Sequence, residues 1–465
     1  MIKSLSIEGF RGFSKECNIE FAIPNDKEGS GFTFIVGSNN SGKSTISEAL
    51  QAFNKCHGSG STFSGPSFSE GKRNGKSKGV TLSLTMSDNS SIKMKTVASG
   101  GSEVDVSCTN QSVISNLKCF VLKSRRSVAQ EFPNSKMNRT DYERNPEFGN
   151  RNPSLPGFEY RLNTMMKNKS KIDPLIKKLL GYELNWTIDK KDSGSYYMKI
   201  TDTNGTHSGE GLGDGVWGVI EICDALYDSE EGSMTVIDEP ELSLHPSVQK
   251  RVLEFLKEYS KDRQIVLSTH SPYFVDWHSI VNGAKLIRVV DDRNAGVITA
   301  YPLSRDICKH MSGLLNNLHN PHILGLDAKE IFFLEDNVIL VEGQDDVVMY
   351  NKILDQLDIK LNGTFYGWGV GGADNMSLFL KMFKELGYKH VVAIFDNDKE
   401  DDANTAKEHY PDYHIEVIPA PDVRDKKERK IEAKQGLVDE SGNIHQQYKD
   451  ELTEMMTRIM GQLSS

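Results

Sequence analysis

The stretch Phe32-Thr-Phe-Ile-Val-Gly-Ser-Asn-Asn-Ser-Gly-Lys-Ser44 joins an apolar strand pattern to a glycine-bounded loop and the start of a helix. It fits the phosphate-binding loop pattern, whose glycines let backbone N–H groups approach phosphate oxygens at a helix N-terminus. In such a loop Lys43 reaches the β- and γ-phosphates, and the Ser44 hydroxyl ligates Mg²⁺. The stretch therefore predicts an α/β fold that binds ATP. The residues expected to contact the nucleotide here are Gly37, Asn39, Asn40, Gly42, Lys43, Ser44 and Thr45.

A second apolar strand pattern, Met234-Thr-Val-Ile-Asp238, ends in acidic residues. We expect Asp238 to lie near the metal of a bound nucleotide and Glu239 to polarise an attacking water. His270 follows the next strand pattern, expected at 264–268. Beside a nucleotide loop it is a candidate sensor of the γ-phosphate, although a histidine taken alone is more often structural. A helix expected near 246–259 separates the two strand patterns, an alternation typical of a mostly parallel sheet covered by helices.

The length of 465 residues suits two or three domains, and 37% hydrophobic with 26% charged residues is typical of a globular protein. No apolar run approaches the roughly 20 residues that cross a bilayer. The N-terminal residues do not form the apolar stretch and cleavage site of a secretory signal. Six scattered cysteines form no C-x-x-C pair, which argues against a disulfide framework and a zinc ribbon. We expect a soluble, cytoplasmic protein with no membrane partner.

The net charge of −10 disfavours a nucleic-acid partner, because the phosphate backbone attracts Lys and Arg. Local distribution matters more than the total. Basic residues cluster at 72–78, 123–126 and 426–434, so a basic track is compatible with an acidic protein. Taken singly, each cluster is more simply a solvated surface.

Acidic residues also end two strand patterns in the C-terminal part. Strands are expected at 337–341, 365–368, 390–395 and 414–418, with helices between them. Glu342 follows the first strand, and Asp346 opens the helix after it. Asp396 and Asp398 follow the third strand, so two strand ends deliver carboxylates to one place. Crowded carboxylates repel one another unless a hard cation neutralises them, and oxygen ligands favour Mg²⁺ or Mn²⁺ over Zn²⁺. A metal site is the simplest interpretation, although either acid pair alone would more often be a solvated strand end.

With these motifs, the N-terminal two-thirds of the chain resembles an ABC-type ATPase of the structural-maintenance-of-chromosomes kind. The resemblance implies that a signature loop from a second subunit closes the nucleotide, and hence a homodimer at least. The best candidate loop is Ser208–Gly215, in which Gly213 is assigned to the nucleotide, although the loop departs from the usual Ser-Gly-Gly pattern. Arg11 resembles the early arginine of such ATPases that touches the nucleotide or the phosphate loop. A surface arginine is the alternative.

A strand-end glutamate followed by an Asp-x-Asp pair resembles the Toprim pattern, which binds metal for phosphoryl transfer on DNA or RNA. An ATPase followed by a Toprim domain resembles the OLD (overcoming lysogenization defect) family of ATP-dependent endonucleases, and the likeness covers nearly the whole sequence. It implies Asp422 or Asp425 as a further acid and Lys434 as a transition-state cation. At the position of Asp346 the family often has glutamate, a departure that shortens the reach to metal. The metal ligands implied are Glu342, Asp346, Asp396, Asp398 and Asp422.

We therefore expect an α/β protein with an ABC-type P-loop ATPase domain over 1–310 and a Rossmann-like Toprim domain over 325–465. A linker is expected within about 305–328. The polar stretch at about 131–205 is interpreted as an insertion, either a dimerisation segment or a helical one. The C-terminal domain is short for a Toprim nuclease, which leaves its substrate preference open.

The implied function is an ATP-regulated, divalent-metal-dependent endonuclease that nicks or cuts DNA, or RNA, in defence against bacteriophage. The alternative is an ATP-driven nucleic-acid sensor or scaffold whose Toprim domain does not cleave and acts through a partner. The resemblance also implies a homodimer or larger homo-oligomer assembled through the ATPase domain. It further implies a defence-system partner such as a helicase-like or reverse-transcriptase component. The catalytic residues implied are Glu239, His270, Glu342, Asp396, Asp398 and Lys434.

Overall fold

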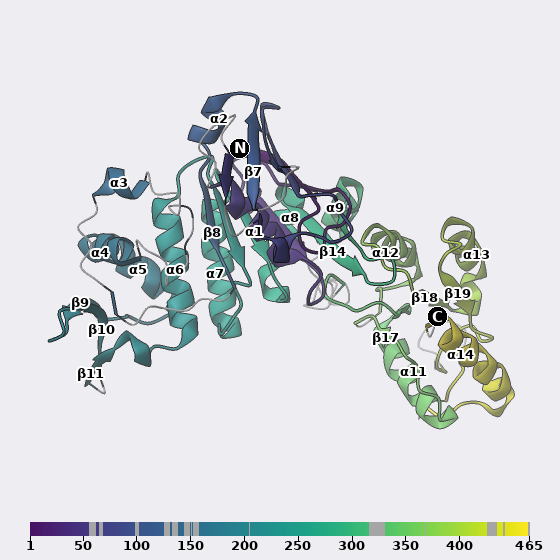
Figure 1. Ribbon diagram of the computed structural model, residues 1–465. Helices are drawn as coiled ribbons and strands as arrows, with labels where there is room; N and C mark the ends of the chain where they lie inside the picture. The colour runs from purple at the N-terminus through teal and green to yellow at the C-terminus, as the bar shows by residue number, and fades with distance from the viewer. Residues whose placement is uncertain are drawn as a thin grey trace. The chain divides into compact units, whose positions relative to one another are not determined.

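Two units make up the chain, Met1–Ala300 and Tyr301–Ser465 (Figure 1). The computed structural model describes residues 1–54, 62–64, 68–97, 102–124, 131–132, 138–143, 149, 151, 158–203, 205–315, 331–367, 369–425, 435–439 and 442–463. Within these ranges, no helix combines the length and the apolar composition that a bilayer crossing requires.

A six-stranded sheet forms the centre of the N-terminal unit, with the strand order β15-β14-β3-β13-β12-β8. The pairs β14–β3, β3–β13, β13–β12 and β12–β8 are parallel. Its strands are β3 (Phe32–Val36), β8 (Cys119–Leu122), β12 (Met234–Asp238), β13 (Gln264–Ser268), β14 (Lys285–Asp292) and β15 (Val297–Pro302). β3, β8, β12 and β13 are buried along their whole length, as expected of parallel strands covered on both faces. The strands expected at 234–238 and 264–268 have the same bounds in the structure.

A second, antiparallel sheet of the same unit has the order β2-β1-β5-β6-β7-β4. Its strands are β1 (Ile2–Glu8), β2 (Cys17–Glu20), β4 (Thr62–Ser64), β5 (Thr81–Met86), β6 (Ser91–Thr96) and β7 (Glu103–Cys108). Buried and exposed residues alternate along β6 and β7, so one face packs inward and the other meets solvent. β5 and β6 form a hairpin across Asp88 and Asn89, in which Thr85 pairs with Ser91.

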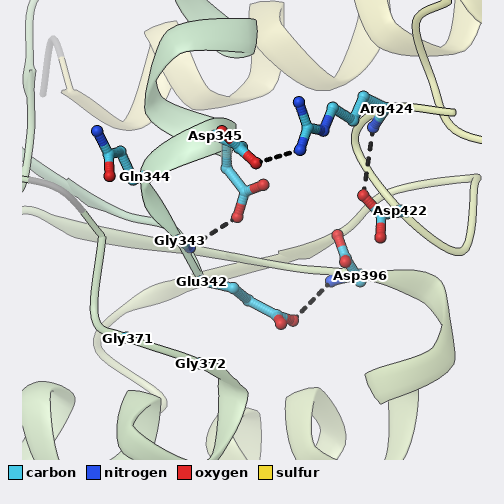
Figure 2. A pocket seen from close by; sticks show the side chains of 10 residues that line it. Glu342, Gly343, Gln344, Asp345, Gly371, Gly372, Asp396, Asp422 and Arg424 are labelled. Carbon is cyan, nitrogen blue, oxygen red and sulfur yellow. Dashed lines mark hydrogen bonds and ion pairs between the residues drawn. The ribbon is translucent and has the colours of Figure 1, made fainter. Parts of the chain in front are cut away.

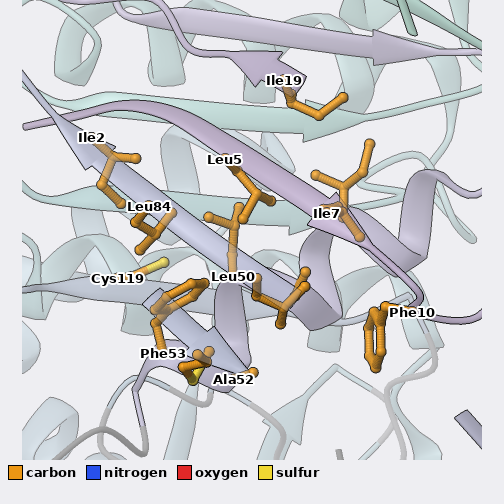
Figure 3. Packing of buried hydrophobic residues seen from close by; sticks show 14 of the residues in the cluster. Ile2, Leu5, Ile7, Phe10, Ile19, Leu50, Ala52, Phe53, Leu84 and Cys119 are labelled. Atoms are coloured by element: carbon orange, nitrogen blue, oxygen red, sulfur yellow. The ribbon is translucent and has the colours of Figure 1, made fainter. Parts of the chain in front are cut away.

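Helix α1 (Lys43–Phe53) packs between the two sheets, and the three share one hydrophobic core (Figure 3). Leu50 and Phe53 of α1 are buried together with Leu5 of β1 and Val236 of β12. Each large apolar side chain buried in this way contributes about 1.5–3 kcal/mol. The helix that follows the phosphate loop is therefore fixed from both sides. The unit's other helices are α2 (Gln111–Ser115), α3 (Arg139–Glu143), α4 (Phe158–Lys167), α5 (Lys169–Leu180), α6 (Asp214–Asp228), α7 (Pro246–Tyr259) and α8 (Trp277–Asn282).

The described part of the polar stretch 131–205 contributes helices and most of a small sheet, which extends to Ser208. Its three antiparallel strands are β9 (Trp186–Lys190), β10 (Tyr196–Asp202) and β11 (Gly205–Ser208). Buried ion pairs attach the stretch to α6. Arg161 Nε lies 2.6 Å from Asp224 Oδ2, and an Arg151 Nη lies 2.8 Å from Asp228 Oδ2. Two arginines of this polar stretch, Arg151 and Arg161, are thus internal partners of α6 acids.

The C-terminal unit is built on a four-stranded parallel sheet with the order β17-β16-β18-β19. Its strands are β16 (Val338–Leu340), β17 (Thr364–Phe365), β18 (Val391–Phe395) and β19 (His414–Val417). Its helices are α9 (Arg305–Leu315), α11 (Gln344–Leu357), α12 (Ala373–Glu385), α13 (Glu400–His409) and α14 (Lys449–Leu463). α11 and α14 share one hydrophobic core with β16 and β18.

The region expected to be a linker begins with a helix. α9 occupies 305–315, while 316–330 lie outside the described residues. Ser304 precedes α9, and its backbone N–H and hydroxyl both donate to the Glu385 carboxylate, at 3.0 and 2.9 Å. Asp306 of α9 pairs with Lys381 of α12. The helix therefore belongs to the C-terminal unit through contacts with residues far along the chain, which local composition does not reveal.

Gln264 offers a test of how the two sheets are held together. Its side chain is buried, accepts from Ile2 N–H at 2.8 Å, and donates to the carbonyls of Ile2 and Ala22 at 2.7 and 2.9 Å. We predict that Gln264→Leu lowers the free energy of unfolding of the N-terminal unit by about 2–4 kcal/mol, because buried backbone groups lose their partners while side-chain volume is kept. Calorimetric unfolding of the full chain measures the change. The exposed Gln111→Leu is the control, and equal effects of the two substitutions would contradict the prediction.

Candidate nucleotide and metal sites

The loop after β3 has the shape of a phosphate cradle. Gly37 has a φ of 150°, and a Cβ there would lie 2.2 Å from the Val289 carbonyl oxygen, so only glycine fits. Lys43 Nζ donates to the carbonyls of Gly37 and Ser38 at 3.0 and 2.9 Å. The ammonium group thus lies across the loop at the start of α1. This is the placement that a bound nucleotide's phosphates require.

The remaining predicted loop residues divide by exposure. Asn39, Asn40 and Ser44 are exposed, while Thr45 is buried. Sequence reasoning missed Ser41, whose hydroxyl is fully buried and has no hydrogen-bond partner. The exposed Ser44 hydroxyl is accessible to a metal ion, so the residues present fit a nucleotide with its cation.

Parallel pairing brings the acids of β12 beside this loop. Asp238 is buried and pairs in register with Ser268, whose hydroxyl donates to the Asp238 carboxylate. Glu239 follows with a positive φ of 50°, and its N–H donates to the Ser268 carbonyl at 2.8 Å. Burial lowers the pKa of Lys43 to about 8, and the charges of Glu239, Asp238 and Glu241 offset part of this effect. The electrostatic coupling places these acids around the loop lysine.

Glu241 is a further functional candidate to which sequence reasoning gave no role. Its carboxylate accepts from the Thr269 hydroxyl at 2.8 Å and from the His270 N–H at 2.6 Å. Burial raises the pKa of Glu241. Burial also lowers the pKa of His270, and the charge of Lys43 adds to this effect. His270 is therefore near Lys43, held by its backbone to the turn after β12. In the sequence, Glu241 could have been recognised as the second glutamate of Asp238-Glu-Pro-Glu241.

Two other predicted nucleotide contacts, Arg11 and Gly213, are not part of the loop itself. Arg11 Nε lies 2.6 Å from Glu48 Oε2 of α1, and Lys72 shares Glu48 at 3.3 Å. Arg11 therefore contacts the helix after the loop. Gly213 caps the N-terminus of α6, where a Cβ would meet nothing within 4 Å.

An acidic pocket of about 360 Å³ lies at the strand ends of the C-terminal unit (Figure 2). β16 and β18 are parallel and pair Leu340 with Ala393, so Glu342 and Asp396 leave the sheet at one edge. Glu342 Oε1 accepts from the Asp396 N–H at 3.2 Å. The residues that line the pocket are Glu342, Gly343, Gln344, Asp345, Asp346, Gly371, Gly372, Asp396, Asp422 and Arg424.

The carboxylates of this pocket interact strongly. Burial raises the pKa of Asp396 to about 8, and the charges of Glu342, Asp346, Asp422 and Asp398 add to this effect. Burial likewise raises the pKa of Glu342. Such a cluster of oxygen donors with excess negative charge fits a hard divalent cation.

These carboxylates do not converge to coordination distance. Asp346 accepts from the Gly343 N–H at 2.7 Å and caps α11, while Asp422 accepts from the Arg424 N–H at 3.3 Å. Among the residues that the structure describes, no three acidic, histidine or cysteine side chains form a group ready to hold an ion. The side chains that were expected to converge therefore line one pocket but do not form a preformed set of ligands.

Three other residues were predicted from the sequence for this metal site, namely Asp398, Asp425 and Lys434. Asp398 lies in the exposed turn Asn397–Lys399 and is not one of the lining residues, although its charge acts on Glu342 and Asp396. Asp425 accepts from the Gly436 N–H at 2.7 Å and lies 3.0 Å from His445 Nε2, so Asp422 is the further acid of this pocket. Lys434 lies outside the described residues.

The pocket also has lining residues that sequence reasoning did not assign. Gly371 and Gly372 have φ values of 79° and 112° and lead into α12. The Gly372 N–H donates to the Glu342 carbonyl at 2.8 Å, which extends the sheet edge. Their signal was the glycine-rich run Gly369-Val-Gly-Gly372 between a strand and a helix. Gln344 had no such local signal, whereas Arg424 lies between the predicted acids Asp422 and Asp425.

Three protein families match parts of the chain. Residues 1–179 match the AAA ATPase domain family. Residues 121–276 match the AAA domain family described for the AbiEii toxin of a Type IV TA system. Residues 333–398 match the TOPRIM domain of overcoming lysogenization defect protein-like proteins.

Individual proteins also resemble the chain. The OLD nuclease of Thermus scotoductus is 30% identical over 215 residues, which are 44% of this chain and 39% of that protein. Endonuclease GajA of Bacillus cereus is 28% identical over 166 residues, which are 35% of this chain and 26% of that protein. The matched stretches thus span well under half of these relatives. Among solved structures, the SMC head domain from Thermotoga maritima aligns with a TM-score of 0.38 and 17% identity, covering 65% of this chain and 99% of that one.

The sheet topology and the family matches agree on an α/β ATPase domain followed by a Toprim domain, as the motifs predicted. The chain therefore joins an AAA-type ATPase domain to an OLD-like Toprim domain, the domain combination of the OLD family that its sequence resembles.

Proposed function

We propose that this protein is an ATP-regulated endonuclease that uses a divalent metal in its Toprim pocket to cut DNA in defence against bacteriophage. The observation that supports this most directly is the pocket itself, which gathers Glu342, Asp396 and Asp422 at one sheet edge with the pKa of Asp396 raised to about 8. Relatives named OLD nuclease and endonuclease match parts of the chain. ATP binding is supported by the Lys43 loop beside Asp238 and His270.

In this proposal Glu342, Asp396 and Asp422 would hold Mg²⁺ or Mn²⁺, with Asp346 and Asp398 as additional acids. A bound ion of this kind supplies Lewis-acid stabilisation of a phosphodiester and a more acidic water. The protein's own part is to keep the acids on rigid strand ends. Lys434 remains our predicted transition-state cation.

The ATPase domain would work as a dimer. Gly213 has an ordinary φ of −66°, and a Cβ there would meet no atom within 4 Å. Neither backbone conformation nor packing within one chain therefore requires glycine at this position. A close approach by a nucleotide bound to a second copy would require it, as the signature-loop assignment implies.

The nuclease is tested by plasmid nicking with Mg²⁺ or Mn²⁺, each with and without ATP. We expect Glu342→Gln and Asp396→Asn to lose at least about 100-fold in nicking rate, because each removes a carboxylate that would hold the ion. Asp401→Asn, an exposed acid of α13, is the matched control and should nick as wild type does. Undiminished nicking by Glu342→Gln or Asp396→Asn would contradict the assignment. ATP-dependent DNA binding without nicking by the wild type would favour the sensor or scaffold alternative.

ATP binding should depend on pH through Lys43. The pKa of this buried ammonium is lowered to about 8, so it loses its charge as pH rises through that value. We expect ATP affinity to be constant below about pH 7 and to fall by about tenfold per pH unit above 8. Lys43→Arg keeps its charge over this range and should give a flat profile with weaker overall binding. Calorimetric titration with ATP between pH 6.5 and 9.5 checks both, and a flat wild-type profile would contradict the role of Lys43.

A shared nucleotide site predicts complementation between two inactive variants. Lys43→Ala removes the loop lysine, and Gly213→Glu places a carboxylate in open space where the fold tolerates it. Each variant alone should have little ATPase activity. In an equimolar mixture, half of the dimers are mixed and each has one intact site, so activity should return to about a quarter of wild type. Mixed dimers that form without regaining activity would rule out the shared site.

A further inference from the structure

The Toprim pocket contains one group that opposes its acidic character. Five carboxylates line it, from Glu342, Asp345, Asp346, Asp396 and Asp422. Arg424 is the only basic side chain among the described residues that line it. A phosphodiester entering this pocket meets repulsion from the acids, because like charges repel strongly where water is partly excluded. Arg424 is therefore the side chain best suited to receive a phosphate.

The backbone of Arg424 is firmly positioned. Its N–H donates to Asp422 Oδ1 at 3.3 Å, and Arg424 pairs with Val438 in an isolated bridge. A Cβ on Gly436 would lie 2.1 Å from the Arg424 carbonyl carbon, so the two segments are in close contact. The side chain is 41% exposed at the pocket. Backbone contacts thus join Arg424 to Asp422 and to residues 436–438.

The guanidinium of Arg424 is paired with Asp345. An Nη atom lies 2.5 Å from Asp345 Oδ2, and Figure 2 shows the guanidinium directed toward that carboxylate. Asp345 belongs to the first turn of α11, where the helix dipole already favours a negative charge. Its side chain is 60% exposed, and ion pairs this exposed contribute little to stability. Another anion can therefore easily replace Asp345 as the partner of Arg424.

A phosphate suits this exchange well. The planar guanidinium presents a fork of N–H donors that matches the oxygens of a phosphate as well as those of a carboxylate. Since both groups compete for the same donors, Arg424 cannot make its full set of bonds to Asp345 and to a phosphate together.

We propose that Arg424 is the residue of the Toprim pocket that binds a backbone phosphate of DNA, and that Asp345 is an internal competitor that a phosphate must displace. This rests on the proposed nuclease function and adds a substrate contact and a built-in restraint to that site. The competing explanation is purely structural, with the Arg424–Asp345 pair fastening the 422–425 segment to α11. The two explanations predict different changes in DNA affinity. If the pair only fastens the segment, loss of Arg424 and loss of Asp345 should have the same effect. If Asp345 competes with phosphate, loss of Arg424 should lower the affinity and loss of Asp345 should raise it.

The test is binding of a fluorescein-labelled single-stranded DNA to the full chain, measured by anisotropy in EDTA without ATP. Arg424→Gln should weaken binding about tenfold and reduce the slope of log affinity against log salt by about one, as expected when one phosphate contact is lost. Asp345→Asn should tighten binding about threefold or more, because it frees Arg424 and removes a negative charge. Asp306→Asn is the matched control. It breaks a pair of similar exposure with Lys381 in the same unit, away from the pocket, and should leave affinity unchanged.

Three results would overturn the inference. Arg424→Gln could bind with wild-type affinity and salt slope, Asp345→Asn could weaken binding as Arg424→Gln does, or Asp306→Asn could tighten it as much as Asp345→Asn. Thermal unfolding of each variant identifies loss of folding, and Arg424→Lys, which keeps the charge but not the fork, should retain part of the affinity. Because the assay contains no metal, its outcome is separate from cleavage. Opposite shifts in a protein that never nicks DNA would support this contact while contradicting the proposed nuclease.

Discussion

Parallel pairing of neighbouring strands is the constraint on which both candidate sites depend. In the N-terminal unit β3, β13 and β12 run in the same direction, so the phosphate loop, His270 and Asp238 leave the sheet at one edge. In the C-terminal unit the same arrangement of β16 and β18 brings Glu342 beside Asp396. Open parallel sheets bind ligands at the carboxyl ends of their strands for this reason. The location of each site thus follows from strand direction and order.

The two sites differ in the balance of positive and negative charge among their residues. The nucleotide loop contains its own cation, since Lys43 donates to two loop carbonyls and is surrounded by acids. The Toprim pocket has an excess of acids, and three of its carboxylates accept backbone N–H bonds. The charge of the first site therefore suits an anionic ligand, and the charge of the second suits a cation.

Much of this architecture could be predicted from the sequence because its elements have strong local patterns. The helix at 246–259 and the strand at 264–268 have the expected bounds, since apolar periodicity and flanking residues define them. Contacts between distant residues were not predictable in this way. The docking of Ser304 on Glu385 and the pairing of Arg424 with Asp345 join residues about 80 positions apart. For the same reason sequence alone left either Asp422 or Asp425 as the further acid, whereas in the structure Asp422 lines the pocket and Asp425 contacts His445.

The ion pairs between α6 and the polar stretch that precedes it have a consequence for evolution. Arg151 and Arg161 are almost completely buried, and their partners Asp224 and Asp228 are on the helix that begins after Gly213. Losing one member of a buried pair leaves an uncompensated charge that costs about 3–5 kcal/mol, whereas replacing both by apolar residues is often neutral. Substitutions at these positions are therefore expected to be correlated across lineages, so that this stretch diverges in paired steps despite its ordinary polar composition.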